Sequence, residues 1–203
     1  MRTSSFVKRY IWRLPLDKIF TSRDLLVYGS RGNVDQTTHK YVKTGVIVRL
    51  ARGVFVKPGP EFEKISVADV AKAKAEAFGK QLSTWGGNLA IRLGIDVGHL
   101  QQFTYYVNAR SSSFWCGGTL VRFKGACPRK TRFGEGSRAG MLLGALWHLG
   151  AAKLPRIQRE YQGLPWQLNR LDKEEVRMSF KWIPHWLSSC FLDWPIPRSA
   201  LYT

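Results

Sequence analysis

The first 60 residues place apolar side chains in two patterns, at helical spacing first and at strand spacing afterwards. Residues 4–13 put Phe6, Tyr10 and Ile11 on one side with charged residues between them, which predicts an amphipathic helix. Pro15 ends this helix, because proline disrupts a helix interior. The chain is therefore expected to begin with a helix that buries one apolar side.

Two more helices are predicted between residues 21 and 44. Thr21 and Asp24 have the spacing of a capping box, and Gly29 ends the helix that they begin. After a turn, Asn33 or Asp35 is expected to cap the next helix. The two helices and the turn between them predict a helix-turn-helix.

A short hairpin is expected to follow. Gly45 ends the third helix, residues 46–50 alternate as in a strand, and residues 54–56 form a partner strand. Gly53 supplies the positive φ that a tight turn needs. A helix-turn-helix followed by a hairpin is the winged-helix arrangement, which is the fold expected for residues 1–60.

The rest of the chain is expected to form a second domain. Residues 58–60 read Pro-Gly-Pro, a rigid break that marks the exit from the first domain. Ser66 and Asp69 form another capping box at the start of a helix. Further on, the pattern predicts a small mixed sheet flanked by helices: helices at 66–79, 88–93, 141–149 and 174–186, a short strand or loop at 82–85, and strands at 103–107 and 118–123. The predicted fold class is α/β (α+β), with a winged helix-turn-helix at 1–60 and a mixed α/β domain at 61–203.

The charge of the chain indicates a polyanionic partner. The 203 residues carry a formal net charge of +18 at pH 7. Residues 1–60 hold 12 Lys or Arg against 3 Asp, whereas residues 61–203 hold 20 against 11 acidic residues. Positive charge is therefore densest on the predicted winged helix, and a basic patch on a fold that reads DNA grooves favours DNA binding.

The outer face of the third helix supplies candidate DNA contacts. Val34, Thr38 and Tyr41 are expected to face the core, which leaves hydrogen-bonding and positive side chains outside. Gln and Thr suit base edges, Lys and Arg suit phosphates, and Arg52 at the hairpin tip suits the minor groove. The candidate DNA-binding residues are Arg31, Gln36, Thr37, His39, Lys40, Lys43, Arg49, Arg52 and Lys57. The alternative is a structural winged helix whose basic face is only solvated. Many winged helices also bind protein rather than DNA.

Residues 45–55 also resemble a known family. Their sequence, Gly-Val-Ile-Val-Arg-Leu-Ala-Arg-Gly-Val-Phe, is similar to the N-terminal domain of AbiEi-type antitoxins, and a weaker likeness extends from Ser66 to the region of Gly150. The resemblance implies a transcriptional repressor of its own operon, the antitoxin of a bacterial type IV, abortive-infection-like toxin–antitoxin system. It implies operator double-stranded DNA and a nucleotidyltransferase-like toxin as partners. The second domain would oppose the toxin, aid formation of a homodimer on DNA, or help to clamp the operator.

The sequence holds no motif that points to catalysis or to a cofactor. It lacks a phosphate-binding loop, a nucleophile elbow and a clustered-carboxylate nuclease pattern, so no catalytic residue, cofactor or metal ligand is expected. Cys116, Cys127 and Cys190 are odd in number and lack metal-ligand spacing, which favours free thiols in a reducing cytoplasm. No signal peptide and no membrane span of ~20 apolar residues is expected. A nuclease with an unrecognised site is a third and weaker interpretation.

Two segments leave alternatives open. Residues 125–140 are rich in Gly and basic residues, which is typical of a flexible loop that contacts DNA, RNA or protein, and equally of a solvated loop. The last forty residues hold four tryptophans, which favour core packing over base stacking or partner binding: Trp166, Trp182, Trp186 and Trp194. The alternative function is a basic adaptor of phage defence or plasmid maintenance that binds a protein or RNA partner.

Overall fold

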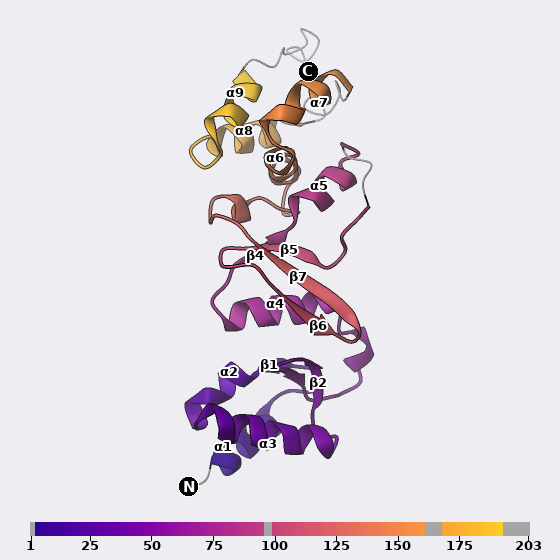
Figure 1. The fold of residues 1–203 in the computed structure, drawn as a ribbon, viewed down its shortest axis with the longest axis vertical. Coiled ribbons are helices and arrows are strands. Elements are labelled where there is room, and N and C mark those ends of the chain that lie inside the picture. The colour runs from indigo at the N-terminus through magenta and orange to yellow at the C-terminus, as the bar shows by residue number, and fades with distance from the viewer. Residues whose placement is uncertain (1–2, 96–98, 161–167, 193–203) are drawn as a thin grey trace. The chain divides into compact units, whose positions relative to one another are not determined.

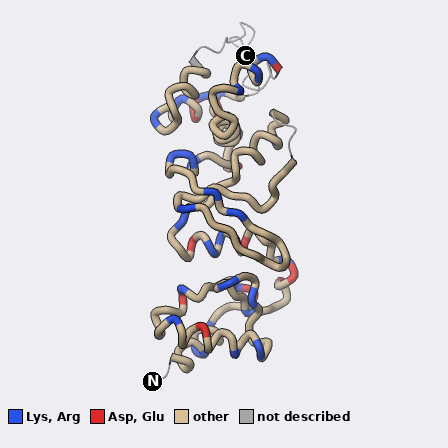
Figure 2. Tube along the Cα trace, in the orientation of Figure 1, with Lys and Arg blue, Asp and Glu red and all other residues tan. Residues whose placement is uncertain are grey.

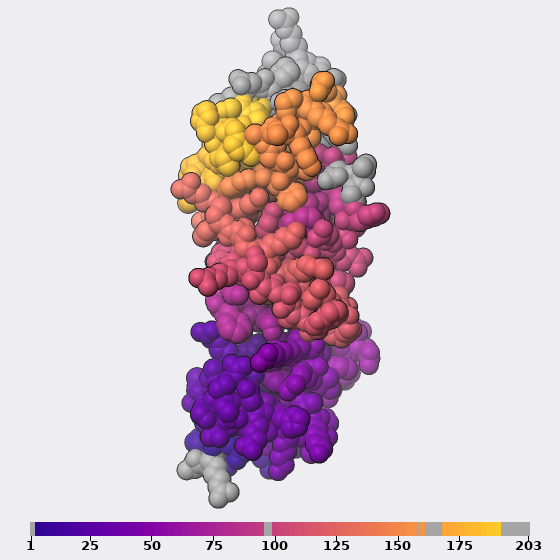
Figure 3. Space-filling model, viewed as in Figure 1, coloured from indigo at the N-terminus to yellow at the C-terminus, as the bar shows by residue number. Residues whose placement is uncertain are grey.

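The computed structural model describes residues 3–95, 99–160 and 168–192; the remaining residues are drawn in grey (Figures 1 and 3). The chain divides into two compact units, each described by itself below. The first unit comprises residues 1–82 and 111–123, and the second comprises residues 83–110 and the described residues from 124 onward. This division differs from the expected boundary at residue 60.

The first unit begins with helices and short strands in alternation. In chain order these elements are α1 (Thr3–Arg13), β1 (Ile19–Thr21), α2 (Ser22–Leu25), the 3₁₀ turn η1 (Leu26–Tyr28), α3 (Arg31–Lys43), β2 (Val48–Ala51) and β3 (Val54–Val56). The three helices and the hairpin agree with the sequence prediction. Strand β1 was not predicted, because three residues are too few to show a period of two.

One apolar cluster holds these elements together. Val7 and Ile11 of α1, Val34 of α3 and Phe55 of β3 are all buried in it. Their burial explains the apolar spacing of α1 and α3, since each helix turns that stripe toward the hairpin and the other helix. Tyr10 packs against the margin of this core and is half-buried. Phe6 is also half-buried and stacks on Tyr28, which packs against the same core.

Helix ends in the first unit follow local capping, with one difference from the prediction. The Asp24 carboxylate accepts a hydrogen bond from the Thr21 N–H at 2.7 Å, as the capping box requires, and a further one from the Thr21 hydroxyl at 3.0 Å. Helix α3, however, has Ser30 at its N-cap, so the expected caps Asn33 and Asp35 are wrong. Arg31 and Asp35 both lie inside the helix, one turn apart, and their side chains form an exposed ion pair at 3.1 Å.

The hairpin is part of a larger antiparallel arrangement. Strand β3 pairs with β1 on one side and with β2 on the other, and β2 continues to β6 (Ser112–Cys116) through an Ala51–Cys116 bridge. Strand β6 forms a hairpin with β7 (Thr119–Gly125). The expected exposed wing therefore has one edge of its β2 strand partly covered.

Helix α4 (Val67–Ala77) completes the first unit and packs against β1 and β3. Its predicted capping box is confirmed: the Ser66 hydroxyl accepts from the Asp69 N–H at 3.2 Å, and Asp69 accepts from the Ser66 N–H at 3.0 Å. Because α4 packs against β1 and β3 and β6 pairs with β2, these elements lie in the same compact unit as residues 1–60.

The second unit is mainly helical. Its elements are β4 (Leu82–Thr84) at the unit boundary, α5 (Gly86–Arg92), β5 (Thr104–Val107), the 3₁₀ turn η3 (Lys130–Arg132), α6 (Arg138–Leu149), η4 (Ala151–Lys153), α7 (Leu154–Glu160), α8 (Arg170–Met178) and α9 (His185–Leu192). Helix α6 packs against α5 and α8 (Figure 1). The single helix expected at 174–186 is instead the end of α8 and the start of α9. Together the two units confirm a mixed α and β fold.

The second unit has its own apolar core around α6. Leu143 and Leu146 of α6, Leu89 of α5 and Leu187 of α9 are fully buried in this core. Trp182 and Trp186 pack against its margin, so the core-packing interpretation holds for these two tryptophans. Trp166 and Trp194 lie outside the described residues. None of the described helices combines the length and the apolar character needed to cross a bilayer.

Candidate nucleic-acid interface

Helix α3 presents a polar and basic outer face, as its sequence predicts. Val34 and Thr38 are buried, whereas Gln36, Lys40 and Lys43 are exposed. His39 is exposed as well. The period of the helix thus divides its side chains between the core and the outside, and the outside carries groups that can bond base edges and phosphates.

Thr37 is less available than its neighbours on α3. Its side chain is half-buried, and its hydroxyl donates to the Asn33 carbonyl oxygen at 2.7 Å. Such a bond back along the helix uses the hydroxyl proton and leaves only acceptor capacity for a ligand. Of the two residues expected to meet bases, Gln36 is therefore the better placed.

Positive charge on α3 is unevenly available. Arg31 near the start is paired with Asp35. Lys40 and Lys43 in the last turns form no ion pair with a carboxylate among the residues that the structure describes. Two lysines at a helix C-terminus also interact favourably with the helix dipole. This structural role is an alternative explanation for their presence, apart from DNA binding.

Arg49 on β2 is exposed and lies across the sheet from Phe55. Its guanidinium sits over the Phe55 ring, 5.7 Å from the ring centroid. The contact with the ring restrains the cation, and the residue remains exposed to solvent. Arg49 therefore keeps the phosphate-binding capacity expected of it.

Arg52 and Gly53 form the tight turn between β2 and β3, with Gly53 at φ 73°. The turn does not stand free, because the Lys74 ammonium of α4 donates to the Arg52 carbonyl oxygen at 2.7 Å. The Arg52 side chain is exposed. The sequence led us to expect that Arg52 enters the minor groove of DNA, and this stays a prediction.

Lys57 serves a structural contact in place of the expected phosphate contact. Its ammonium donates to the carbonyl oxygens of Trp12 and Leu14, each at 3.2 Å, and lies 5.8 Å from the centroid of a Trp12 ring. These carbonyls are at the C-terminal end of α1, where a cation is stabilising. The contacts join residues more than forty positions apart, so no local pattern could have revealed them.

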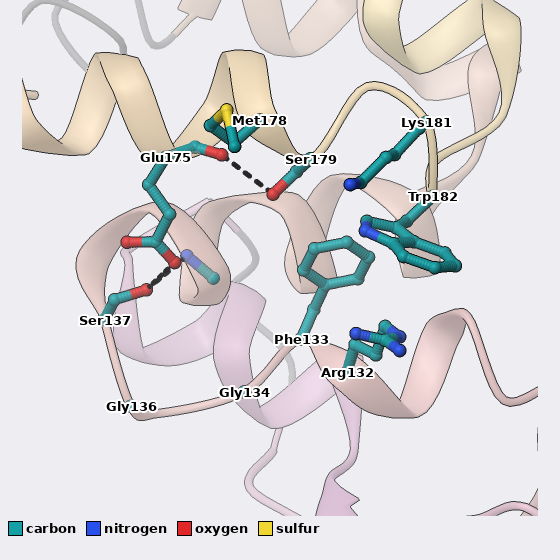
Figure 4. A pocket seen from close by; sticks show the side chains of 11 residues that line it. Arg132, Phe133, Gly134, Gly136, Ser137, Glu175, Met178, Ser179, Lys181 and Trp182 are labelled. Atoms are coloured by element: carbon teal, nitrogen blue, oxygen red, sulfur yellow. Dashed lines mark hydrogen bonds between the residues drawn. The ribbon is translucent and has the colours of Figure 1, made fainter.

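The second unit contains a cavity of about 450 Å³ beside the Gly-rich segment (Figure 4). Ser137 caps α6, and its hydroxyl donates to the Glu175 carboxylate at 2.5 Å. The start of α6 therefore already faces a carboxylate of the chain itself, which satisfies the positive end of that helix. Arg132 and Trp182 close the other side, with the guanidinium 4.0 Å from the ring centroid.

The basic segment 125–140 is packed through some of its cations and is not simply a loose loop. The Lys130 ammonium lies 5.1 Å from the Tyr106 ring centroid and 5.8 Å from a Trp147 centroid. Burial lowers the pKa of Lys130, because loss of water disfavours the charged ammonium. Arg129 remains exposed on the same segment.

A tyrosine and a histidine in the second unit form the contact most like a catalytic pair. The Tyr106 oxygen lies 2.9 Å from His148 Nδ1, and Trp85 packs edge-on against the same imidazole. Burial raises the pKa of Tyr106 to about 12, so its hydroxyl stays protonated at neutral pH. A neutral phenol that is buried between rings is a poor nucleophile and a good structural hydrogen-bond donor.

No group of three or more His, Cys, Asp or Glu side chains is arranged to hold a metal ion in the part of the chain that the structure describes. The three cysteines are free thiols, and burial raises the pKa of Cys116. Comparison with models of protein families, with curated proteins and with solved structures found nothing that matches this chain.

Proposed function

We propose that the chain is a sequence-specific DNA-binding protein that uses the outer face of α3 to read duplex DNA. The observation that carries the proposal is the division of α3 into a buried apolar side and an exposed side with Gln36, Lys40 and Lys43. The chain order of α1, β1, α2, α3, β2 and β3, with β3 between β1 and β2, supports the proposal of a winged helix.

In this proposal Gln36 and His39 point toward base edges from the middle of α3 when the helix enters the major groove. Lys40, Lys43 and Arg49 then neutralise phosphates on either side. Arg52 lies on the β2–β3 turn, three residues after Arg49, and would contact the DNA backbone or the minor groove. Lys57 is left out of the interface, because its ammonium is bound to α1.

The biological role proposed is that of a cytoplasmic antitoxin and transcriptional repressor, acting on operator DNA as a homodimer beside a nucleotidyltransferase-like toxin. The support is the resemblance of residues 45–55 to AbiEi-type antitoxins. In this proposal the toxin would be bound by a surface of the second unit, separate from the DNA-binding face of α3.

The first test is a binding titration of the full chain on duplex DNA at several salt concentrations. Affinity is expected to fall steeply between about 50 and 200 mM salt, since each neutralised phosphate releases counterions. The double variant Lys40→Gln/Lys43→Gln should lower the slope of log K against log salt by about two units. Lys153→Gln/Lys173→Gln, which removes the same charge from the second unit, is the matched control. Equal losses in both variants would contradict a role for α3.

The basic adaptor remains the second candidate because positive charge is spread over both units (Figure 2). Residues 61–203 carry as large a net charge as residues 1–60. A single-stranded RNA that competes with duplex as well as unlabelled duplex does, with no preference among duplex sequences, would favour this candidate.

A further inference from the structure

A cavity of about 430 Å³ lies within the first unit, between the start of α2, the β2–β3 turn and α4. Its wall combines one buried serine with four basic side chains and apolar groups: Ser22, Arg23, Arg31, Arg52, Lys74 and Phe78. No Asp or Glu is among the described residues that line it.

The four cations come from four different elements and converge without a carboxylate in the wall. Arg31 shares its charge with Asp35 outside the cavity, whereas Arg23, Arg52 and Lys74 form no ion pair among the residues that the structure describes. Burial, followed by the positive charges of Arg52 and Lys80, lowers the pKa of Lys74. Like charges held together in this way cost free energy that a bound anion would recover.

Ser22 adds an independent sign of a missing ligand. The residue is only 4% exposed, and its hydroxyl is one of two buried side-chain polar atoms that lack a hydrogen-bond partner in the described chain. Its backbone N–H is satisfied by the Gly53 carbonyl oxygen at 2.9 Å. Buried hydroxyls are nearly always bonded, so an unpaired hydroxyl in the wall of a basic cavity indicates an absent acceptor.

We propose that this cavity binds a phosphate group. The Ser22 hydroxyl donates to one phosphate oxygen, the Arg23 and Arg52 guanidiniums offer paired donors to the others, and the Lys74 ammonium adds a point charge. Phe78, whose ring centroid lies 5.4 Å from the Arg23 guanidinium, adds an apolar group to the wall against which the organic part of a phosphate ester can pack. The phosphate belongs either to a nucleic-acid backbone or to a free phosphate or nucleotide; only the first case rests on the proposed DNA binding.

The experiment uses the full chain and two cavity variants, Ser22→Ala and Lys74→Gln. Each has a matched control: Ser83→Ala removes the other unpaired buried hydroxyl, in the second unit, and Lys72→Gln removes an exposed lysine from α4. Isothermal titration measures the affinity for inorganic phosphate and for adenosine monophosphate, and a parallel titration measures the affinity for duplex DNA. Thermal unfolding checks that Ser22→Ala is folded, which is expected because loss of an unpaired buried hydroxyl removes no bond.

Ser22→Ala is expected to weaken phosphate binding by about 3- to 10-fold, the effect of one hydrogen bond, and Lys74→Gln more than that, with both controls unchanged. Weakening in the phosphate or nucleotide arm alone identifies a free phosphate as the ligand. Weakening in the duplex arm identifies the backbone. Absence of a difference between cavity variants and controls in every arm overturns the proposal. If the parent chain binds phosphate but does not bind duplex DNA, the proposed DNA-binding function is wrong and the phosphate site stands.

Discussion

Lysines of one small unit serve different purposes, and only their contacts tell them apart. Lys43 is exposed on α3 without an ion pair in the described chain, while Lys57 bonds the end of α1. Lys74 bonds the β2–β3 turn and faces a cavity. Net charge therefore overstates the number of side chains available to a nucleic acid, and each lysine needs its own test.

Lys57→Met is expected to lower the free energy of unfolding by about 1–2 kcal/mol, because two carbonyls at the end of α1 lose a charged donor. Duplex affinity should stay within about a factor of two of the affinity of the parent chain. Chemical denaturation and a DNA titration of the same preparations make the measurement. Lys18→Met, at an exposed position between α1 and β1, is the control. A large loss of DNA affinity at unchanged stability would return Lys57 to the interface.

Gln36→Ala and Lys43→Ala separate base reading from charge. Gln36→Ala should cost about 1–3 kcal/mol on a duplex selected for tight binding and little on a scrambled duplex. Lys43→Ala should weaken both duplexes equally and lower the salt slope by about one unit. Binding titrations on the two duplexes at several salt concentrations distinguish these effects. If both variants bind like the parent, α3 is not the reading surface and the adaptor becomes the leading candidate.

At the scale of elements, the sequence predicted those whose signals are local. Capping pairs such as Ser66–Asp69 and closing glycines such as Gly45 located helices without knowledge of the rest of the chain. Strand β1 and the bridge between Ala51 and Cys116 could not be found in this way. Both depend on pairing between distant segments, and a three-residue strand or a single bridge is too short to show a recognisable sequence pattern.

Ser66→Ala tests the local signal at the start of α4. The variant should lose about 1 kcal/mol of stability at pH 7, the usual effect of removing a cap. Hydrogen bonds from the Ser66 hydroxyl and backbone lower the pKa of Asp69 below its ordinary 3.8. A lowered carboxyl pKa stabilises the fold fully above the unfolded value, and that contribution disappears as the pH falls through the folded value.

The difference in unfolding free energy between parent and Ser66→Ala should therefore shrink as the pH is lowered past about 3.8. Denaturation curves at neutral and acid pH give this difference directly. Ser113→Ala, at an exposed position on β6, should show little effect at either pH. A difference that is constant across the range would mean that Asp69 does not take part in the cap.

At the scale of the molecule, the first unit is discontinuous along the chain. Residues 111–123 return to it after the chain has entered the second unit, and they supply the strand that bridges β2. The proline-glycine break at 58–60 suggested a boundary because it interrupts local structure. It does not interrupt packing, since α4 follows it and packs against β1 and β3. A break in local secondary structure, such as Pro-Gly-Pro, therefore need not coincide with the boundary of a compact unit.

A fragment of residues 1–60 is expected to bind DNA weakly, yet to be less stable than the same residues in the full chain. It keeps the apolar cluster around Phe55 but loses the cover of α4, the bond from Lys74 to the β2–β3 turn and the partner of Ala51. Exposed apolar surface and an unpaired strand edge both favour partial unfolding and association. Circular dichroism during heating and a duplex titration compare the fragment with the full chain and with residues 1–82. The gain from 1–60 to 1–82 measures α4, and the remaining gap measures everything after residue 82, including β6 and β7. A fragment 1–60 with undiminished stability would show that the boundary at residue 60 separates independent folding units after all.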